Sequence, residues 1–169
     1  MVEGVKILDG SRHQDERGFF EEWYGKNTLE NFEVMQANLS RSNLGVIRGL
    51  HFSFEENDQA KLVKCIEGEI WDVVVDFRRH SPSYLKWTAM KLSSEKNTAI
   101  YIPPGVGHGF QSLTPSSSIV YLQTSVYDPE KEFTINPLDS TLAISWPISF
   151  RESTISERDA SAPSISWLS

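Results

Sequence analysis

Short runs rich in Val, Ile, Phe, Tyr and Trp recur along this chain, and turn-forming residues separate each run from the next. No stretch has helical periodicity long enough for alternating β-α-β units. Many short strands at close spacing are typical of a sandwich or a barrel. We therefore expect strands at 5–8, 18–24, 34–41, 46–52, 61–67, 69–77, 85–92, 98–102, 109–113 and 119–127.

The connections between these runs carry further signals. Glu67-Gly68 lies between two strand-like runs and predicts a tight hairpin. Residues 27–32 could form a short helix, and from Asp139 onward the chain is rich in Ser and Pro, which indicates loops and short helical turns. With 169 residues and neither an internal repeat nor a linker, we expect one domain spanning 1–169.

Parity within the strands separates polar from apolar side chains. Alternate residues of a strand share a face, so Tyr121 and Gln123 lie on one side of their strand, as Gln36 and Asn38 do on theirs. A polar stripe on a strand ordinarily meets solvent. Uncharged hydrogen-bonding residues, however, also suit the inside of a barrel that holds a ligand, so parity alone leaves both interpretations open.

Composition narrows the class of protein. The net charge is −7 and the pI is about 5.1, which counts against a nucleic-acid partner because such proteins carry a basic face. No stretch approaches the roughly 18 apolar residues of a membrane span, and we expect no membrane partner. The single cysteine, Cys65, lies in an apolar run and is expected to be buried and reduced, which together with the lack of a signal-peptide-like run favours the cytoplasm.

The segment Pro103-Pro104-Gly105-Val106-Gly107-His108 resembles the second sequence motif of the cupin superfamily, whose histidine points into a β-barrel. In metal-binding cupins the other ligands come from an H-x-H pair and a glutamate. The comparable stretch here, 48–52, holds only His51. Because a divalent transition metal normally takes three or four good ligands, we expect a cupin-like barrel with no metal and no cofactor.

A sharper resemblance extends from about Asp15 to Pro163. Seven motifs are similar, in order, to those of the dTDP-4-dehydrorhamnose 3,5-epimerase family: 15–23, 36–52, 59–61, 71–84, 102–110, Tyr121 with Tyr127, and 144–159. The resemblance implies an all-β fold, a cupin-like jelly-roll β-barrel with short peripheral helices. It also implies an epimerase that inverts carbons 3 and 5 of a nucleoside-diphosphate 4-keto-6-deoxyhexose in deoxysugar biosynthesis.

By this resemblance, four residues carry the chemistry. The 4-keto group acidifies the protons on carbons 3 and 5, so epimerisation needs a base, a partner for the enolate and an acid on the opposite face. His51 is the implied base, and Asp159 holds its imidazole. Lys61 is expected beside the enolate oxygen, and Tyr121 is the expected proton donor.

The resemblance also assigns residues to the nucleotide sugar. Arginines suit a diphosphate, and aromatic rings stack on a flat base. The implied binding residues are Arg17, Phe20, Glu22, Gln36, Asn38, Arg48, His108 and Tyr127. In this family the N-terminal strand crosses to a second subunit, so we expect a homodimer in which Arg17, Phe20 and Glu22 serve the neighbour's site.

Three alternatives stay open at this level. The first is an epimerase that inverts only carbon 3 or only carbon 5 of a modified nucleotide sugar. The second is a metal-dependent cupin oxygenase or isomerase, which the missing H-x-H pair disfavours. The third is a non-catalytic sugar-binding cupin, which would need neither a base such as His51 nor an acid such as Tyr121.

Overall fold

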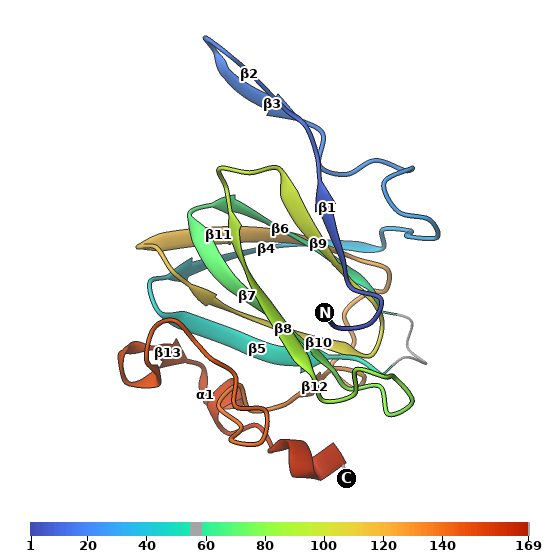
Figure 1. Ribbon diagram of the computed structural model, residues 1–169, viewed down its shortest axis with the longest axis vertical. Coiled ribbons are helices and arrows are strands. Elements are labelled where there is room, and N and C mark those ends of the chain that lie inside the picture. The colour runs from blue at the N-terminus through green and yellow to red at the C-terminus, as the bar shows by residue number, and fades with distance from the viewer. Residues whose placement is uncertain (55–58, 169) are drawn as a thin grey trace.

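The computed structural model describes residues 1–54 and 59–168, and it consists almost entirely of β-strands (Figure 1). Two antiparallel sheets face each other. The first contains, in spatial order, β1 (Lys6–Asp9), β9 (Thr98–Ile102), β6 (Lys61–Glu67), β11 (Ser116–Gln123) and β4 (Gln36–Asn43). The second contains β12 (Phe133–Thr134), β5 (Val46–Phe52), β10 (Val106–Ser112), β7 (Glu69–Asp76) and β8 (Trp87–Ser93), and β13 (Thr154–Ile155) adds to β5 in parallel.

The all-β jelly roll predicted from the sequence is confirmed. Three predicted strands match in full, β5, β6 and β9, and the other predicted strands differ at their ends. Across the described residues the two sheets stay open at their edges and do not close into one continuous barrel ladder. The helical turns in the C-terminal part are short, as expected: η2 (Phe150–Glu152), α1 (Glu157–Ala160) and η3 (Ile165–Leu168).

Two local predictions were wrong. Residues 27–32 form turns, one of them closed by Thr28 N–H donating to the Gly25 carbonyl at 2.9 Å. Glu67-Gly68 does not make a hairpin, because β6 pairs with β9 and β11, whereas β7 pairs with β10 and β8. Gly68 instead turns the chain from one sheet to the other.

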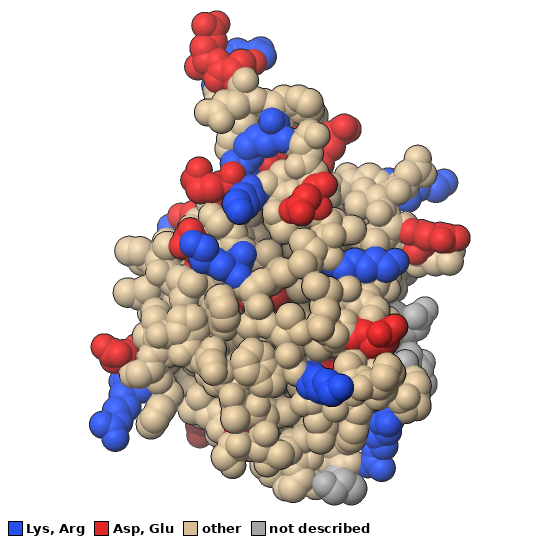
Figure 2. All heavy atoms as spheres, viewed as in Figure 1, with Lys and Arg blue, Asp and Glu red and all other residues tan. Residues whose placement is uncertain are grey.

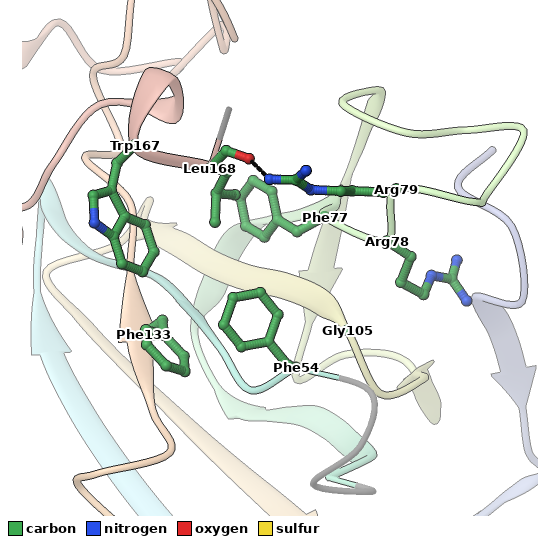
Figure 3. A pocket seen from close by; sticks show the side chains of 8 residues that line it. All are labelled: Phe54, Phe77, Arg78, Arg79, Gly105, Phe133, Trp167 and Leu168. Atoms are coloured by element: carbon green, nitrogen blue, oxygen red, sulfur yellow. Dashed lines mark hydrogen bonds between the residues drawn. The ribbon is translucent and has the colours of Figure 1, made fainter.

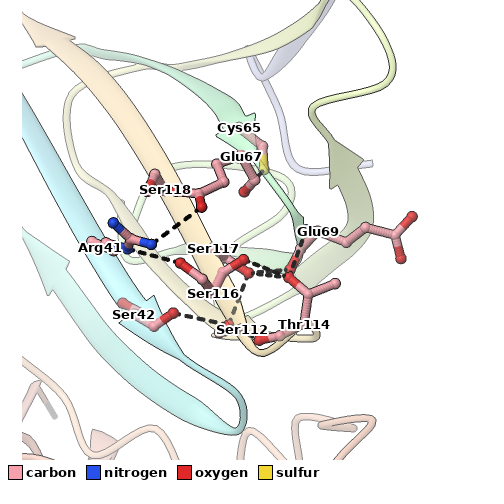
Figure 4. A network of polar contacts seen from close by, with 10 residues as sticks. All are labelled: Arg41, Ser42, Cys65, Glu67, Glu69, Ser112, Thr114, Ser116, Ser117 and Ser118. Carbon is pink, nitrogen blue, oxygen red and sulfur yellow. Dashed lines mark hydrogen bonds and ion pairs between the residues drawn. The ribbon is translucent and has the colours of Figure 1, made fainter.

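The neighbours of this corner leave no room for a side chain at residue 68 (Figure 4). Gly68 has φ +69°, and a Cβ there would lie 2.2 Å from Thr114 Oγ1 and 2.4 Å from the Ser116 carbonyl oxygen. Ser117 Oγ donates to the Glu69 carbonyl at 2.7 Å, and Cys65 Sγ lies 3.3 Å from the Gly68 carbonyl. Cys65 is buried as expected, and burial raises the pKa of its thiol to about 11.

Apolar side chains form three clusters. The main core fills one half of the space between the sheets, and its members include Val63, Cys65, Ile70, Val74, Ile100 and Ile119. A second cluster lies on the outer face of the second sheet beneath the C-terminal segment, with Leu50, Val73, Val75, Ile135 and Leu168. A third packs residues 23–34 onto the outer face of the first sheet through Leu29, Phe32, Leu62 and Leu122. The other half of the inter-sheet space is left for a cavity.

The β2–β3 hairpin, Arg12–Asp15 and Gly18–Glu21, stands away from the two sheets (Figure 1). Figure 2 shows acidic and basic side chains gathered on this projection, whereas much of the body in the same view is uncharged. None of the helices in the described residues has the length and apolar character that a membrane span requires.

Candidate active site

A cavity of about 370 Å³ opens between the two sheets. Strands of both sheets, the loop after β11 and helix α1 contribute its walls. The lining residues are Gln36, Asn38, Ser40, Arg48, His51, Lys61, His108, Phe110, Ile119, Tyr121, Gln123, Tyr127, Glu132 and Arg158.

The polar stripes of β4 and β11 face this cavity. The two strands are paired so that Asn38 lies opposite Tyr121 and Gln36 lies opposite Gln123. Gln36 Nε2 donates to Asn38 Oδ1, and Asn38 Nδ2 donates to Gln123 Oε1, both at 2.8 Å. The Tyr127 amide completes the chain by donating to Gln36 Oε1 at 2.7 Å. These side chains therefore form a fixed wall of amides that can recognise a polar ligand.

His51 and Asp159 form a hydrogen-bonded dyad. His51 Nε2 lies 2.8 Å from Asp159 Oδ1, and the Asp159 side chain is only 5% exposed. Asp159 Oδ2 accepts the backbone N–H of Gly49 at 3.1 Å, which fixes the carboxylate from a second direction. Burial acts to raise the pKa of Asp159, but the hydrogen bonds from His51 and Gly49 outweigh it and hold this pKa below its usual value.

The backbone brings these two residues together. Ser156 caps α1 by accepting the Asp159 amide, which presents the carboxylate toward β5. On β5, Gly49 has φ +113°, and a Cβ there would lie 2.6 Å from both the Gly109 Cα and the His108 carbonyl oxygen. A glycine pair at 49 and 109 thus lets β5 and β10 approach closely enough to align His51 with His108 across the ladder.

Lys61 and Tyr121 lie on neighbouring strands and face the same cavity. Desolvation lowers the pKa of Lys61, and the carboxylate of Glu132 partly counters this effect. Desolvation raises the pKa of Tyr121, and Glu132 adds to that rise while Arg48 opposes it. The cavity therefore combines an ammonium group with reduced affinity for its proton and a phenol that stays protonated at neutral pH.

His108 forms a second histidine–carboxylate pair. Its Nε2 lies 2.7 Å from Oδ2 of Asp72, whose side chain is fully buried. The other carboxylate oxygen of Asp72 is buried without a hydrogen-bond partner among the described residues. Arg48 lies nearby on the same cavity wall, where Ser42 Oγ and the Arg41 carbonyl accept its hydrogen bonds at 3.0 and 3.2 Å.

Nine predicted residues meet at this cavity: His51, Asp159, Tyr121, Lys61, Gln36, Asn38, Arg48, His108 and Tyr127. Three predicted residues, Arg17, Phe20 and Glu22, do not line it. They lie on the projecting hairpin and just after it, all of them exposed, with Arg17 bonded to Asp15. Their assignment to a neighbour's site stays a prediction.

Three residues that line the cavity, Glu132, Arg158 and Gln123, and the supporting residue Asp72 were not among the predicted site residues. Glu132 and Arg158 form an ion pair at 3.0 Å, Gln123 accepts a hydrogen bond from Asn38, and Asp72 is bonded to His108. Gln123 shares a strand face with Tyr121, and Arg158 directly precedes Asp159, so both could have been predicted from the sequence. Glu132 follows a turn, where parity gives no information, and only the fold brings it to the cavity.

Among residues 1–54 and 59–168, no group of three or more His, Cys, Asp or Glu side chains is arranged to hold a metal ion. His51 and His108 are each bonded to a carboxylate through Nε2. That the reaction needs no metal and no cofactor remains a prediction.

A second and larger cavity, of about 520 Å³, lies beneath the C-terminal segment (Figure 3). Phe54, Phe77, Phe133 and Trp167 surround it, with Arg78 and Arg79 at one side. The described residues that line it include no carboxylate, imidazole or phenol, whereas all three kinds of group line the cavity between the sheets. The candidate active site is therefore the smaller cavity between the sheets.

Comparison with known proteins gives concordant results. The family model for dTDP-4-dehydrorhamnose 3,5-epimerase matches residues 1–166. The enzyme of that name from Mycobacterium tuberculosis (strain CDC 1551 / Oshkosh) is 40% identical over 96% of this chain and 84% of its own length. A 3,5-epimerase from Legionella pneumophila, solved with dTDP-4-keto-L-rhamnose, has a TM-score of 0.91 and 37% identity over 98% of this chain and 89% of its own. A 3'-monoepimerase from Streptomyces bikiniensis, solved with dTDP-quinovose, has a TM-score of 0.92 and 37% identity over 98% and 85%.

Proposed function

The chain belongs to the dTDP-4-dehydrorhamnose 3,5-epimerase family and is an isomerase of a dTDP-linked 4-keto-6-deoxyhexose in deoxysugar biosynthesis, and we propose that it inverts both carbon 3 and carbon 5. The observation that carries the epimerase chemistry is the His51–Asp159 dyad, which shares one cavity with Lys61 and Tyr121, and the similarity to 3,5-epimerases favours inversion of both carbons. A base, a cation and a phenol around one space are the groups that enolate chemistry requires.

In the proposed reaction, His51 removes the proton from the carbon next to the ketone. The C–H electron pair moves into the enolate, whose oxygen Lys61 stabilises. Tyr121 then gives its phenolic proton to the opposite face of the same carbon, and the phenolate and the imidazolium regain their resting states by exchange with solvent. The net change is an inverted centre, with no electrons gained or lost.

Binding is assigned to the polar wall and the cations. Arg48 and His108 face the diphosphate and the sugar, because a guanidinium matches phosphate oxygens well. Gln36, Asn38 and Tyr127 suit the base, since their amides are fixed by mutual hydrogen bonds and the Tyr127 ring is partly exposed at the cavity mouth. Arg17, Phe20 and Glu22 are proposed to complete the site of a second subunit.

A homodimer is supported by two exposed apolar surfaces. On the outer face of the first sheet, Leu39 is 68% exposed and Ile66 is 45% exposed. On the hairpin, Phe19 and Phe20 are 58% and 64% exposed. A second copy of the chain would cover both surfaces, as self-complementary interfaces do. A cytoplasmic location is also proposed, on the ground that the single Cys65 forms no internal disulfide.

Heavy water tests the function directly. With dTDP-4-keto-6-deoxyglucose as substrate, NMR should show deuterium entering carbons 3 and 5 together with inversion of both centres. The Tyr121→Phe variant should keep the exchange, because the base survives, but lose much of the inversion.

Two other outcomes of the heavy-water experiment would favour the alternative functions. Inversion with deuterium at one carbon only would favour a single-site epimerase, the class to which the Streptomyces bikiniensis relative belongs. Absence of deuterium at both carbons, with the dTDP-linked and the GDP-linked sugar and despite measurable binding, would refute the enolate mechanism and favour a sugar-binding cupin.

A further inference from the structure

The projecting hairpin is bonded to the body of the protein at its base, whereas its tip extends away from the body (Figure 1). At the tip, a Cβ added to Gly18 would meet no atom within 4 Å. At the base, the hairpin rests against the outer face of the first sheet, on the opposite side of β6 from Lys61 and the cavity. We define the hairpin clamp as Arg12, Glu21, Lys64 and Asn97.

Lys64 is the centre of the clamp. It projects from the outer face of β6 and is only 1% exposed. Its Nζ lies 3.2 Å from Glu21 Oε1 and donates to Asn97 Oδ1 at 3.0 Å and to the Lys96 carbonyl at 3.3 Å. Burial acts to raise the pKa of Glu21, but hydrogen bonds from Arg12 and Lys64 outweigh it and lower this pKa, so the carboxylate stays charged at neutral pH.

Arg12 fastens the hairpin from the other side. Its Nε donates to Glu21 Oε2 at 2.8 Å, and its Nη2 donates to the Ser94 carbonyl at 2.6 Å. The same guanidinium lies 3.9 Å from the centre of the Phe19 ring. One charged group thus connects the two hairpin strands, the body of the protein and an exposed aromatic ring next to Phe20.

Asn97 holds the two chain ends of the hairpin. Its Nδ2 donates to the carbonyl of Ser11 at 2.9 Å and to that of Glu22 at 3.2 Å, the residues just before and just after the two strands. The backbone contributes as well, because the Gly10 N–H donates to the Asn97 carbonyl at 2.8 Å. These bonds fix the direction in which the hairpin leaves the body.

Removing an ion pair from water is costly, and an apolar pair of similar size is often as stable or more so. The clamp is therefore a costly way to gain stability alone, and its directed hydrogen bonds favour one orientation of the hairpin. We propose that the hairpin clamp positions the hairpin for the neighbouring subunit, so that Lys64 of one chain sets the substrate affinity of the other chain's site. This inference rests on the proposed dimeric function and names Lys64 as a positioning residue.

The expected effect on KM and kcat depends on which part of the substrate the hairpin contacts. Its residues are assigned to the nucleotide, which is remote from the reacting carbons, so they contribute equally to the ground state and the transition state. A loosened hairpin must be ordered again at each binding event, which weakens binding without slowing the chemistry. Lys64→Met should raise KM roughly tenfold, while kcat changes less than about twofold.

Lys91→Met controls for the loss of a lysine charge from an ion pair. Lys91 pairs with Glu69 at 3.1 Å on the second sheet, and its side chain is 55% exposed. This variant loses the same charge from an ion pair that has no contact with the hairpin, and it should keep the wild-type KM and kcat. Glu21→Gln is a milder change of the clamp and should raise KM in the same direction if Lys64→Met folds poorly.

Heterodimers with two different affinity tags test action between subunits. A Lys64→Met chain paired with a His51→Ala chain holds one working site, which combines an intact dyad with an intact hairpin, and it should show the wild-type KM. Wild type paired with a Lys64→Met/His51→Ala chain also holds one working site, but with a loosened hairpin, and it should show the raised KM.

The opposite pattern, with the raised KM following the chain that carries the dyad, would overturn the inference. A normal KM in both the Lys64→Met and the Glu21→Gln homodimers would overturn it as well, and so would a fall in kcat with KM unchanged. Each of these results leaves the proposed function intact. Failure of wild type to exchange substrate protons, or a monomeric wild type, would instead refute the proposed function itself.

Discussion

Asp159 acts on His51 through a single carboxylate that is fixed from two directions. One oxygen contacts His51 Nε2 and the other accepts the Gly49 amide, while the Ser156 hydroxyl accepts the Asp159 amide. These contacts hold the imidazole in one orientation, and we propose that the neighbouring carboxylate offsets the charge that the imidazole gains when it takes a proton from the substrate. If Asp159 acts through His51, then changing both residues should cost little more activity than changing His51 alone, whereas a purely structural carboxylate would give independent losses.

We predict that Asp159→Asn keeps the fold and lowers kcat by about a hundredfold or more, because the amide neither orients the imidazole nor stabilises its charge. His51→Ala with Asp159→Asn should be little worse than His51→Ala alone, since losses within one catalytic unit do not add. Steady-state rates of the two single variants and the double variant measure this coupling. Losses that multiply would assign Asp159 a purely structural role.

The positions of the site residues depend on where the chain turns between strands and on how closely neighbouring strands approach. Gly68 carries the chain from β6 in the first sheet to β7 in the second, and in doing so puts Lys61 and Asp72 on facing sheets. The glycine pair at 49 and 109 draws β5 against β10. Both positions depend on the absence of a side chain, because backbone or hydroxyl oxygens occupy the space that a Cβ would need.

Gly68→Ala should therefore destabilise the protein by about 1–3 kcal/mol, since the new methyl group meets Thr114 Oγ1 and the Ser116 carbonyl while the backbone stays at positive φ. Gly25→Ala is the control, because its Cβ would meet only Thr28 Oγ1, at 3.8 Å. Chemical denaturation of the two variants measures the difference. Equal stability of both variants would mean that the corner relaxes easily.

Across the whole molecule, a buried carboxylate ties the N-terminal segment to the second sheet. Asp76 accepts hydrogen bonds from Arg78 at 2.8 Å and from Ser81 and Ser83. Arg78 also donates to the Glu3 carbonyl at 2.6 Å. Burial acts to raise the pKa of Asp76, but these hydrogen bonds outweigh it and lower the pKa to about 2.

A depressed carboxyl pKa stabilises the folded state above the unfolded value of 3.8, and this stability is lost as the pH falls from 3.8 toward about 2. The melting temperature of the wild type should fall through that window. Asp76→Asn should be less stable at pH 7 and should lose less on acidification, whereas Asp9→Asn, at an exposed position, should follow the wild type. Thermal melts from pH 7 down to pH 2 test this, and parallel curves for wild type and Asp76→Asn would contradict it.

The sequence by itself determined where most of the longer strands lie and which of their residues share a side. A period of two is a local property of extended backbone, so Gln36, Asn38, Tyr121 and Gln123 could be assigned to common faces before any pairing was known. The motifs also identified His51, Lys61, Tyr121 and Asp159, and these residues meet at one cavity.

Only the tertiary structure decided which strands pair and which residues outside the strands reach the cavity or the hairpin clamp. Gly68 satisfies the local requirements of both a hairpin and a corner, and the choice depends on contacts with Thr114 and Ser116, which are distant in sequence. Glu132 and the partners of Lys64 are likewise brought together by long-range packing. Such contacts depend on which surfaces become buried together, a property of the whole chain that no local pattern contains.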